Sequence, residues 1–409
     1  MDNILLAKYA RLVVKTGLNL QPKQTLVITS PIECAPFTRL VSEMAYATGA
    51  QDVVIQWRDE LFSKIRYLHA PDEVFEEFPK WQKEFYLTYV HQGAAFLSIS
   101  ASDPELMKDV NPERMNKVQK ASNTALKEYM DRLFSNKNTW CVVSVPTASW
   151  AKKVFPHLSE ELAIEKLWEV IYKTVRINTD NPEASWDEHK TNLKTRMDFL
   201  NSLTLKSLQY RNSLGTDLNI ELPDQHTWIG GSDYTPEGLE FIANMPTEEV
   251  FTCPQKTGVN GTVVSSMPLN YNGNLIDQFS LTFKDGKIVD YSAVKGYETL
   301  KTIIETDEGS HYLGEVALVP YDSPISNSNI LFYNTLFDEN ASCHLALGKA
   351  YPVCINNSEN MNQEDLSKLG VNESLVHVDF MIGTCDLEIL GKTSDGKEIP
   401  VFKNGNFVL

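Results

Sequence analysis

The chain lacks the features that mark several common classes of protein. Its six cysteines, among 409 residues, are scattered and form no C-x-x-C pair, so we expect neither a dense disulfide framework nor a zinc site built from paired cysteines. No run of about 18 apolar residues occurs, so no transmembrane helix is expected. The 37 lysine and arginine residues are outnumbered by 54 acidic residues, and the net charge of −17 argues against nucleic acid or a membrane surface as partner. Six reduced, mostly buried thiols in a cytoplasmic protein are the simplest interpretation.

The familiar catalytic fingerprints are absent as well. There is no G-x-G-x-x-G or G-x-x-x-x-G-K-[ST] for a nucleotide, no G-x-S-x-G for a serine hydrolase and no H-E-x-x-H for a single zinc ion. The first residues, MDNILLAKYARLVVK, are amphipathic and interrupted by lysine and arginine, which does not fit a signal peptide.

The first half of the chain alternates between short apolar runs and helical stretches. This pattern predicts an α/β domain, with a parallel sheet flanked by helices. The expected strands are Thr25–Ser30, Gln51–Trp57, AAFLSIS and TWCVVSVP, and the expected helices include Asn3–Thr16, Ala35–Tyr46, Trp81–Tyr89 and Pro112–Phe134.

From about Leu205 the segments become short, alternating and divided by turn residues. Asn272-Gly273 and Asp285-Gly286 predict two tight β-hairpins. We therefore expect a β-rich α+β C-terminal domain, with the α/β domain at residues 1–195 and the β-rich domain at residues 196–409.

Polar residues of the kind that bind metals occur in four apolar or tightly turned segments of the second half. They lie in PTEEVFT, which contains Glu248 and Glu249, in GEVALV, which contains Glu315, in ENASCHLALGKAY, which contains His344 and Tyr351, and in VHVDF, which contains His377 and Asp379. Residues two apart on a strand share a face, so His377 and Asp379 are either a hydrogen-bonded polar pair or two ligands of a metal site. Taken alone, each other residue has an ordinary interpretation: a solvated carboxylate, a buried core histidine or a packed tyrosine.

Together these four segments resemble the M29 family of metallopeptidases, the group of aminopeptidases T, S and PepS. The resemblance extends over the whole chain and is most specific in P-T-E-E-V-F-T, G-E-V-A-L-V, H-L-A-x-G-x-A-Y and H-x-D. It implies metal ligands at Glu249, Glu315, His344, His377 and Asp379, with the glutamate directly before the valine chosen over Glu248. It further implies Glu315 and Tyr351 as catalytic residues and a metal site in the β-rich domain.

The residues in this pattern suit the chemistry that the resemblance implies. Three carboxylates and two imidazoles form a mixed oxygen and nitrogen set without thiolate, which suits two ions of zinc, cobalt or manganese. Two such ions can activate a water molecule for hydrolysis. If Asn340–Ala350 is helical, His344 and Tyr351 share a helix face.

Two hypotheses from different classes follow. The first is a cytoplasmic metal-dependent aminopeptidase, a homodimer that acts on peptides with a free N-terminus and binds neither nucleic acid nor membrane. The alternative is an α/β binding protein with a structural metal, or with no metal and no catalysis. Cys253 and Cys343 are interpreted as small buried thiols, and the acidic stretch ETDEG (Glu305–Gly309) as a solvated loop.

Overall fold

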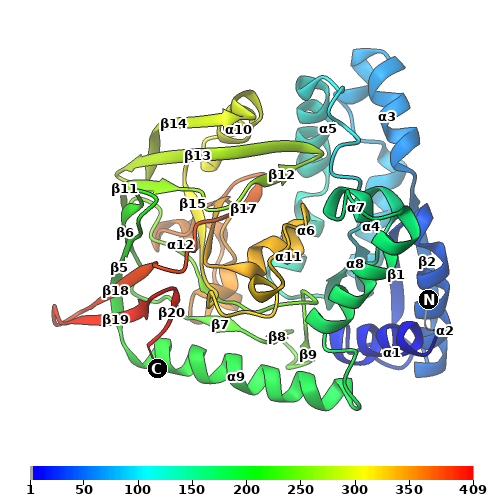
Figure 1. Cartoon of the computed structure of the whole chain (residues 1–409), viewed down its shortest axis with the longest axis horizontal. Coiled ribbons are helices and arrows are strands. Elements are labelled where there is room, and N and C mark those ends of the chain that lie inside the picture. The colour runs from blue at the N-terminus through cyan, green and yellow to red at the C-terminus, as the bar shows by residue number, and fades with distance from the viewer. Residues whose placement is uncertain (1–2, 409) are drawn as a thin grey trace. The chain divides into compact units, whose positions relative to one another are not determined.

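In the computed structural model, which describes residues 3–408, the N-terminal part of the chain is built on four parallel strands. Figure 1 draws this part of the chain from blue to cyan. Strand β1 (Thr25–Pro31) lies between β2 (Asp52–Arg58) and β3 (Ala95–Ile99), and β4 (Trp140–Val143) pairs with β3. Every residue of β1 after Thr25 is buried, as expected for a parallel strand covered on both faces. The predicted α/β fold of this part is confirmed.

Local sequence signals set the ends of the helices that alternate with these strands. Helix α2 (Ala35–Thr48) has a proline in its first turn and ends at Gly49, whose φ of +99° favours glycine. Asn111 caps α5 (Pro112–Ala125) by accepting a hydrogen bond from the backbone N–H of Glu113. The remaining helices here are α1 (Asn3–Leu12), which a π-helical turn (Val13–Gly17) follows, α3 (Glu60–His69), α4 (Lys80–His91), α6 (Lys127–Phe134), α7 (Ala148–Val154), α8 (Glu160–Thr174) and α9 (Pro182–Ser202).

One predicted helix is divided in two. The stretch Pro112–Phe134 is interrupted at Leu126, whose φ of −98° and ψ of 13° end α5 before α6 begins. Ser122, Asn123 and Thr124 precede the break, and all three have low helix propensity.

The chain forms two compact units. The first contains the residues up to Lys190 together with 232–247 and 330–336, and the second contains the rest. The two inserted segments are bound to the first unit by specific contacts: Val142 pairs with Asn244, and Trp150 Nε1 donates a hydrogen bond to Phe332 O at 2.6 Å. The proposed boundary between residues 195 and 196 falls inside α9.

The second unit contains two antiparallel sheets. One has five strands in the order β17-β16-β15-β10-β7, and the other has nine in the order β12-β13-β11-β6-β5-β18-β19-β20, with β14 paired to β13. The strands of the first sheet are β7 (Ile229–Gly230), β10 (Val250–Thr252), β15 (Leu313–Leu318), β16 (His344–Gly348) and β17 (His377–Met381). Those of the second are β5 (Leu205–Arg211), β6 (Asp217–Glu221), β11 (Val259–Val264), β12 (Leu269–Tyr271), β13 (Asn274–Lys284), β14 (Lys287–Lys295), β18 (Glu388–Thr393), β19 (Glu398–Lys403) and β20 (Asn406–Phe407).

Short elements complete the description. A two-stranded ribbon consists of β8 (Asp233–Tyr234) and β9 (Glu240–Phe241), and the remaining α-helices are α10 (Tyr297–Ile304), α11 (Thr335–Asp338) and α12 (Gln363–Lys368). The two predicted hairpins are confirmed: Asn272-Gly273 joins β12 to β13, and Asp285-Gly286 joins β13 to β14. All four turn residues have positive φ, as two-residue hairpin turns of type I′ require.

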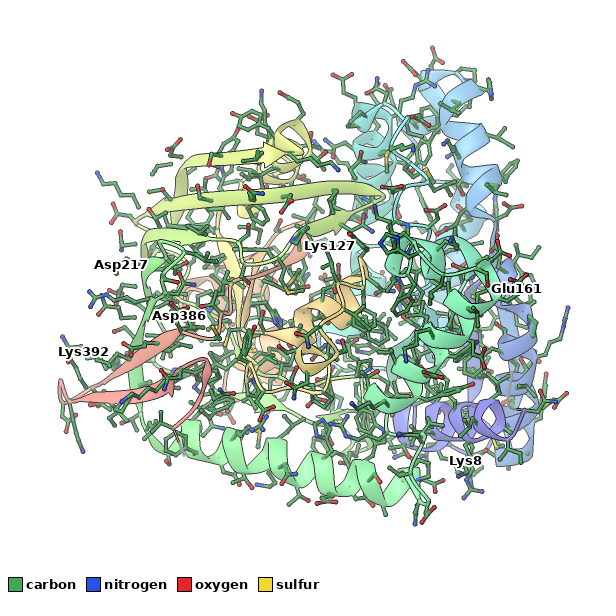
Figure 2. All side chains as sticks on the ribbon, in the orientation of Figure 1. Lys8, Lys127, Glu161, Asp217, Asp386 and Lys392 are labelled. Atoms are coloured by element: carbon green, nitrogen blue, oxygen red, sulfur yellow. The ribbon has the colours of Figure 1, made fainter. Side chains whose placement is uncertain are left out.

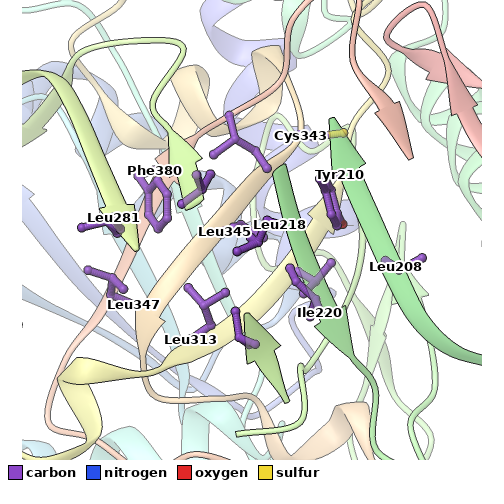
Figure 3. Packing of buried hydrophobic residues seen from close by; sticks show 14 of the residues in the cluster. Leu208, Tyr210, Leu218, Ile220, Leu281, Leu313, Cys343, Leu345, Leu347 and Phe380 are labelled. Carbon is purple, nitrogen blue, oxygen red and sulfur yellow. The ribbon is translucent and has the colours of Figure 1, made fainter. Parts of the chain in front are cut away.

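The hydrophobic core of the second unit is formed by residues from both sheets (Figure 3). Leu208, Tyr210, Leu218 and Ile220 come from the nine-stranded sheet, and residues such as Leu345 come from the five-stranded sheet. Because side chains alternate along a strand, one face of the five-stranded sheet supplies this core and its other face carries a different set of residues.

Charged side chains lie on the surface, and Glu161, Asp217 and Lys392 are exposed examples (Figure 2). Five of the six cysteines are buried and free, and Cys385 is exposed. Among residues 3–408, no helix combines the length and the apolar character that a membrane span needs.

Candidate metal centre

The alternation of β15, β16 and β17 places polar residues on the face of the five-stranded sheet that points away from the core. On β15, Val316 and Leu318 enter the core, so Glu315 points to the opposite face. Val378 and Phe380 do the same on β17, which leaves His377 and Asp379 together on the polar face. The interpretation of V-H-V-D-F as a strand with its polar pair on one face is confirmed.

Strand β16 leaves room above the sheet for these side chains. Leu345 and Leu347 belong to the core, so the polar face of β16 shows only His344, Ala346 and Gly348. Ala346 pairs with Glu315 on one side and with Asp379 on the other. A methyl group between two carboxylates leaves the space that a bound ion would need.

Glu249 joins this face from the residue directly before β10. Val250 is in the core and pairs with Leu318 of β15, so Glu249 lies at the strand entrance beside Glu315. The backbone N–H of Glu248 donates to Asn340 Oδ1 at 2.6 Å, which holds this segment in place.

The structure brings the five predicted ligands together. Within residues 3–408, two groups have ligand atoms close enough to hold a metal ion, and they share one carboxylate. His344 Nε2 lies 3.0 Å from Glu249 Oε2 and 3.4 Å from Glu315 Oε1, while His377 Nε2 lies 3.4 Å from Asp379 Oδ1 and 3.7 Å from Glu315 Oε2. Glu315 thus presents one oxygen to each group.

Both histidines are oriented by backbone carbonyls. His344 Nδ1 lies 3.3 Å from Ser342 O, and His377 Nδ1 lies 2.6 Å from Lys349 O. A carbonyl can only accept a hydrogen bond, so each neutral ring carries its hydrogen on Nδ1 and directs the Nε2 lone pair at the carboxylates. This arrangement is typical of histidines that bind metals.

The orphaned oxygen atoms at the site fit a cation. When both rings are neutral, the buried atoms Glu249 Oε2 and Asp379 Oδ1 have no hydrogen-bond donor, because the nearest nitrogens, Nε2 of His344 and of His377, then carry lone pairs. A buried carboxylate oxygen without a donor is destabilising, and a divalent ion would satisfy it. The donor set of carboxylate oxygen and imidazole nitrogen therefore fits a metal ion.

The electrostatics show the same excess of negative charge. Burial, together with the negative charges of Asp379 and Glu249, raises the pKa of Glu315 to about 7, although the hydrogen bond with His344 lowers it. Burial lowers the pKa of His377, but the carboxylates of Asp379 and Glu315 outweigh burial and raise the pKa to about 9. Without metal, protons bound to Glu315 and His377 therefore offset part of the negative charge that a metal ion would otherwise balance.

Tyr351 reaches the site by a different route from the one predicted. The conditional helix over Asn340–Ala350 is wrong, because β16 pairs on both edges with β15 and β17. Tyr351 follows that strand, and its ring lies edge-on to His377 with 5.1 Å between the ring centroids. Burial, reinforced by the nearby carboxylates, raises the pKa of Tyr351 well above its usual value, so its hydroxyl stays protonated.

Glu339 is a carboxylate near the site that sequence reasoning missed. It is buried, and burial together with the charges of Asp379 and Glu249 raises its pKa well above the ordinary value. The signal was an acidic residue five positions before His344 in the segment DENASCH. Nothing in that segment alone distinguished Glu339 from a solvated acid.

The other residues considered from sequence have structural roles. Cys253 and Cys343 are buried, and burial raises the pKa of Cys343 to about 12, so it remains a thiol. In the acidic stretch, Asp307 accepts hydrogen bonds from Ser310 N, Ser374 Oγ and Leu375 N. Asp307 therefore holds the segment that leads into β17.

A family model described as thermophilic metalloprotease (M29) matches residues 2–407. The chain belongs to the M29 metallopeptidase family. The predicted resemblance and the predicted enzyme class, an aminopeptidase of this hydrolase family, are confirmed. Family membership also decides against the alternative of a binding protein without catalysis.

Relatives match over nearly the whole chain. Aminopeptidase 2 of Geobacillus stearothermophilus is 52% identical over 402 residues, which are 98% of this chain and 97% of that protein. Aminopeptidase AmpS of Bacillus subtilis (strain 168) is 51% identical over 399 residues, again 98% and 97%. The solved structure of wild-type AmpT from Thermus thermophilus has a TM-score of 0.90 at 37% identity and covers 99% of both chains.

Proposed function

We propose that this protein removes the N-terminal residue from peptides by hydrolysis with two divalent ions, which Glu249, Glu315, His344, His377 and Asp379 would hold. The shared carboxylate carries the proposal: each oxygen of Glu315 faces a different group of ligand atoms. Glu249 and His344 would complete one ion site, and His377 and Asp379 the other. The oxygen and nitrogen donors suit zinc, cobalt or manganese.

Bound divalent ions would supply Lewis acidity, which lowers the pKa of water and stabilises negative charge on a carbonyl oxygen. Each oxygen of Glu315 faces one ligand group, so it is the carboxylate nearest the attacking water. It would either bridge the two ions or, with one oxygen not bound to an ion, accept the proton of that water and return it to the leaving amine. The protonated hydroxyl of Tyr351 is suited to donate a hydrogen bond to the oxygen atom that becomes negative during the attack.

Recognition of a free α-amine needs a group that the ions leave available. The carboxylates of Glu249, Glu315 and Asp379 would balance the charge of the two ions, so the amine would be bound by an ion itself or by the nearby Glu339, which is not a proposed ligand. A substrate ammonium at this position would set the cleaved bond one residue from the chain end. An N-acetylated peptide lacks that charge and is expected not to be cleaved.

The place and assembly of the enzyme are part of the same proposal. Five buried free thiols are compatible with a reducing compartment, which supports the cytoplasm. The homodimer is proposed from the family resemblance, and sedimentation velocity tests it.

Metal analysis combined with hydrolysis of aminoacyl-p-nitroanilides tests the activity. We expect about two ions per chain and loss of turnover with a chelator that divalent metal reverses. A protein that binds no divalent ion, or that cleaves a peptide and its N-acetyl form at equal rates, would contradict the proposal.

A further inference from the structure

The two histidines of the candidate metal centre are held with different strength. His377 Nδ1 lies 2.6 Å from Lys349 O, whereas His344 Nδ1 lies 3.3 Å from Ser342 O. A short hydrogen bond fixes both the tautomer and the direction of the ring. The geometry of the ion site formed by Glu315, His377 and Asp379 therefore depends on where the Lys349 carbonyl lies.

One buried residue holds the backbone on both sides of Lys349, with its side chain before Lys349 and its main chain after it. Asn372 Nδ2 donates to Gly348 O at 2.6 Å, just before Lys349, and the main-chain oxygen of Asn372 accepts a hydrogen bond from Ala350 N at 2.9 Å, just after it. The second hydrogen of Nδ2 is donated to Gly309 O at 2.8 Å. Asn372 is 1% exposed, so water does not compete for these contacts.

Close packing restrains the same carbonyl from another side. A Cβ atom on Gly314 would lie 2.4 Å from Lys349 O, which shows how closely the backbone of β15 approaches this group. The backbone N–H of Lys349 donates to Val376 O at 2.7 Å, directly before His377. With Asn372 in place, the peptide around Lys349 has no freedom to turn.

Asn372 also has an unsatisfied atom. Its Oδ1 is buried and accepts no hydrogen bond. Exchanging Oδ1 and Nδ2 would place an oxygen against two carbonyl oxygens, so the orientation of the amide is determined. A side chain that leaves one polar atom unpaired to keep two donors in place suggests that those donors matter for more than stability.

We propose that Asn372 is a positioning residue for the ion held by Glu315, His377 and Asp379; this rests on the proposed two-ion centre. Its side-chain amide fixes the Gly348–Lys349 peptide and thereby the direction of the next peptide, whose Lys349 carbonyl fixes the Nδ1–H tautomer and the orientation of His377. The other ion site depends on Ser342 for its histidine, which Asn372 does not contact through any of these hydrogen bonds. Loss of Asn372 therefore weakens one ion site selectively.

The chain offers a matched control for the test. Asn138 is 2% exposed and its Nδ2 also donates to two backbone carbonyls, Val90 O and Ala94 O, each at 3.0 Å. It belongs to the first unit, whereas all the proposed ligands belong to the second. Asn138→Ala removes the same kind of hydrogen bonds without touching the metal centre.

The experiment compares Asn372→Ala, Asn138→Ala and the unchanged full chain, all loaded with zinc. Thermal unfolding is measured for each, and zinc per chain is measured after dialysis against buffers of stepped free zinc concentration. Both variants are expected to unfold at a lower temperature. Only Asn372→Ala is expected to lose affinity at one of its two sites, by about 10- to 100-fold, and to hold about one ion where the unchanged protein holds two.

The outcomes separate this inference from the proposed function. If the unchanged protein binds no zinc, the two-ion centre itself is wrong, and with it this inference. If the unchanged protein binds two ions and Asn372→Ala matches it, or if Asn138→Ala shows the same loss, the positioning role is wrong. Should Asn372→Ala not fold, Asn372→Leu, which fills a similar space and has no donor, takes its place, and an unchanged zinc affinity there overturns the inference.

Discussion

Glu315 acquires its chemistry from its position on β15. It is buried between two histidines and two further acids, and burial raises the pKa of its carboxyl to about 7. We predict that Glu315→Gln, which keeps the size and removes the charge, lowers kcat by about 10²-fold or more, the typical share of general acid–base catalysis. The thermal midpoint should change little in comparison, because the replaced group is isosteric.

The measurement is kcat at saturating metal, with metal content determined on the same sample. Glu221→Gln, at an exposed position at the end of β6 in the same unit, is the matched control and should keep full activity. Turnover of Glu315→Gln close to that of the unchanged enzyme at full metal load would contradict the proton-transfer role.

Tyr351 is the second residue whose chemistry is open to a direct test. The change Tyr351→Phe keeps the ring contacts with His377 and Phe251 and removes only the hydroxyl. We expect kcat to fall by about 10²-fold, as when one oxyanion donor is lost, while the number of bound ions stays the same. If metal content falls together with kcat, the hydroxyl acts as a ligand and not as a hydrogen-bond donor.

At this scale the sequence predicted the proposed ligands but not their surroundings. Glu249, Glu315, His344, His377 and Asp379 were named through motif resemblance, and the structure brings their ligand atoms together. Glu339 and Asn372 were not predicted from the sequence, because their contacts with the site form only when segments distant in the chain pack around them.

Strand β16 shows how an element shapes the site with residues that carry no chemistry. Ala346 is fully buried and lies between Glu315 and Asp379 in the strand register. We predict that Ala346→Val inserts two methyl groups into the space of the ions, lowers metal occupancy and activity, and destabilises the fold by about 1–3 kcal/mol through overpacking.

Metal content and thermal unfolding are the measurements for this prediction. Ala293→Val on β14, a partly buried position in the other sheet, is the control and should keep its metal. Full metal occupancy in Ala346→Val would show that the ions lie away from this part of the sheet.

The elements also show where local patterns suffice. V-H-V-D-F predicted β17 because its apolar and polar residues alternate without a break. H-L-A-L-G alternates too, but a run of five residues after E-N-A-S-C is short enough to suit either a helix or a strand. Pairing with β15 and β17 decided in favour of the strand.

For the whole molecule, metal binding should be coupled to pH and to stability. Without metal, the pKa of His377 is raised from 6.5 to about 9, so its contribution to stability is fully present below pH 6.5 and is lost as pH rises through 9. A bound ion requires the neutral ring, so it must displace this proton. The stabilisation by metal, measured as the difference in Tm between the metal-loaded and the chelator-treated protein, is therefore expected to grow from pH 6.5 to pH 9.

The same linkage predicts that the proton on His377 alone makes apparent metal affinity at pH 7 about 50-fold weaker than at pH 9, where half of the rings are already neutral. Metal titrations in weakly buffered solution should also release protons at pH 7. A metal stabilisation that is constant or decreases over this range would contradict the assignment of His377 as a ligand.

The sequence by itself determined the local structure and the family. Apolar runs between helices predicted the parallel sheet, the Asn-Gly and Asp-Gly pairs predicted the hairpins, and four motifs carried the M29 resemblance. These features depend on neighbours in the chain, whose spacing and conformational preferences can be read directly. The tertiary structure alone decided that β16 is a strand and that the ring of Tyr351 lies edge-on to His377. It also placed Glu339 near the proposed ligands and bound Asn372 to the backbone at the end of β16. Those arrangements depend on pairing between segments far apart in sequence, because a local pattern defines which face a side chain takes but not which distant face it meets.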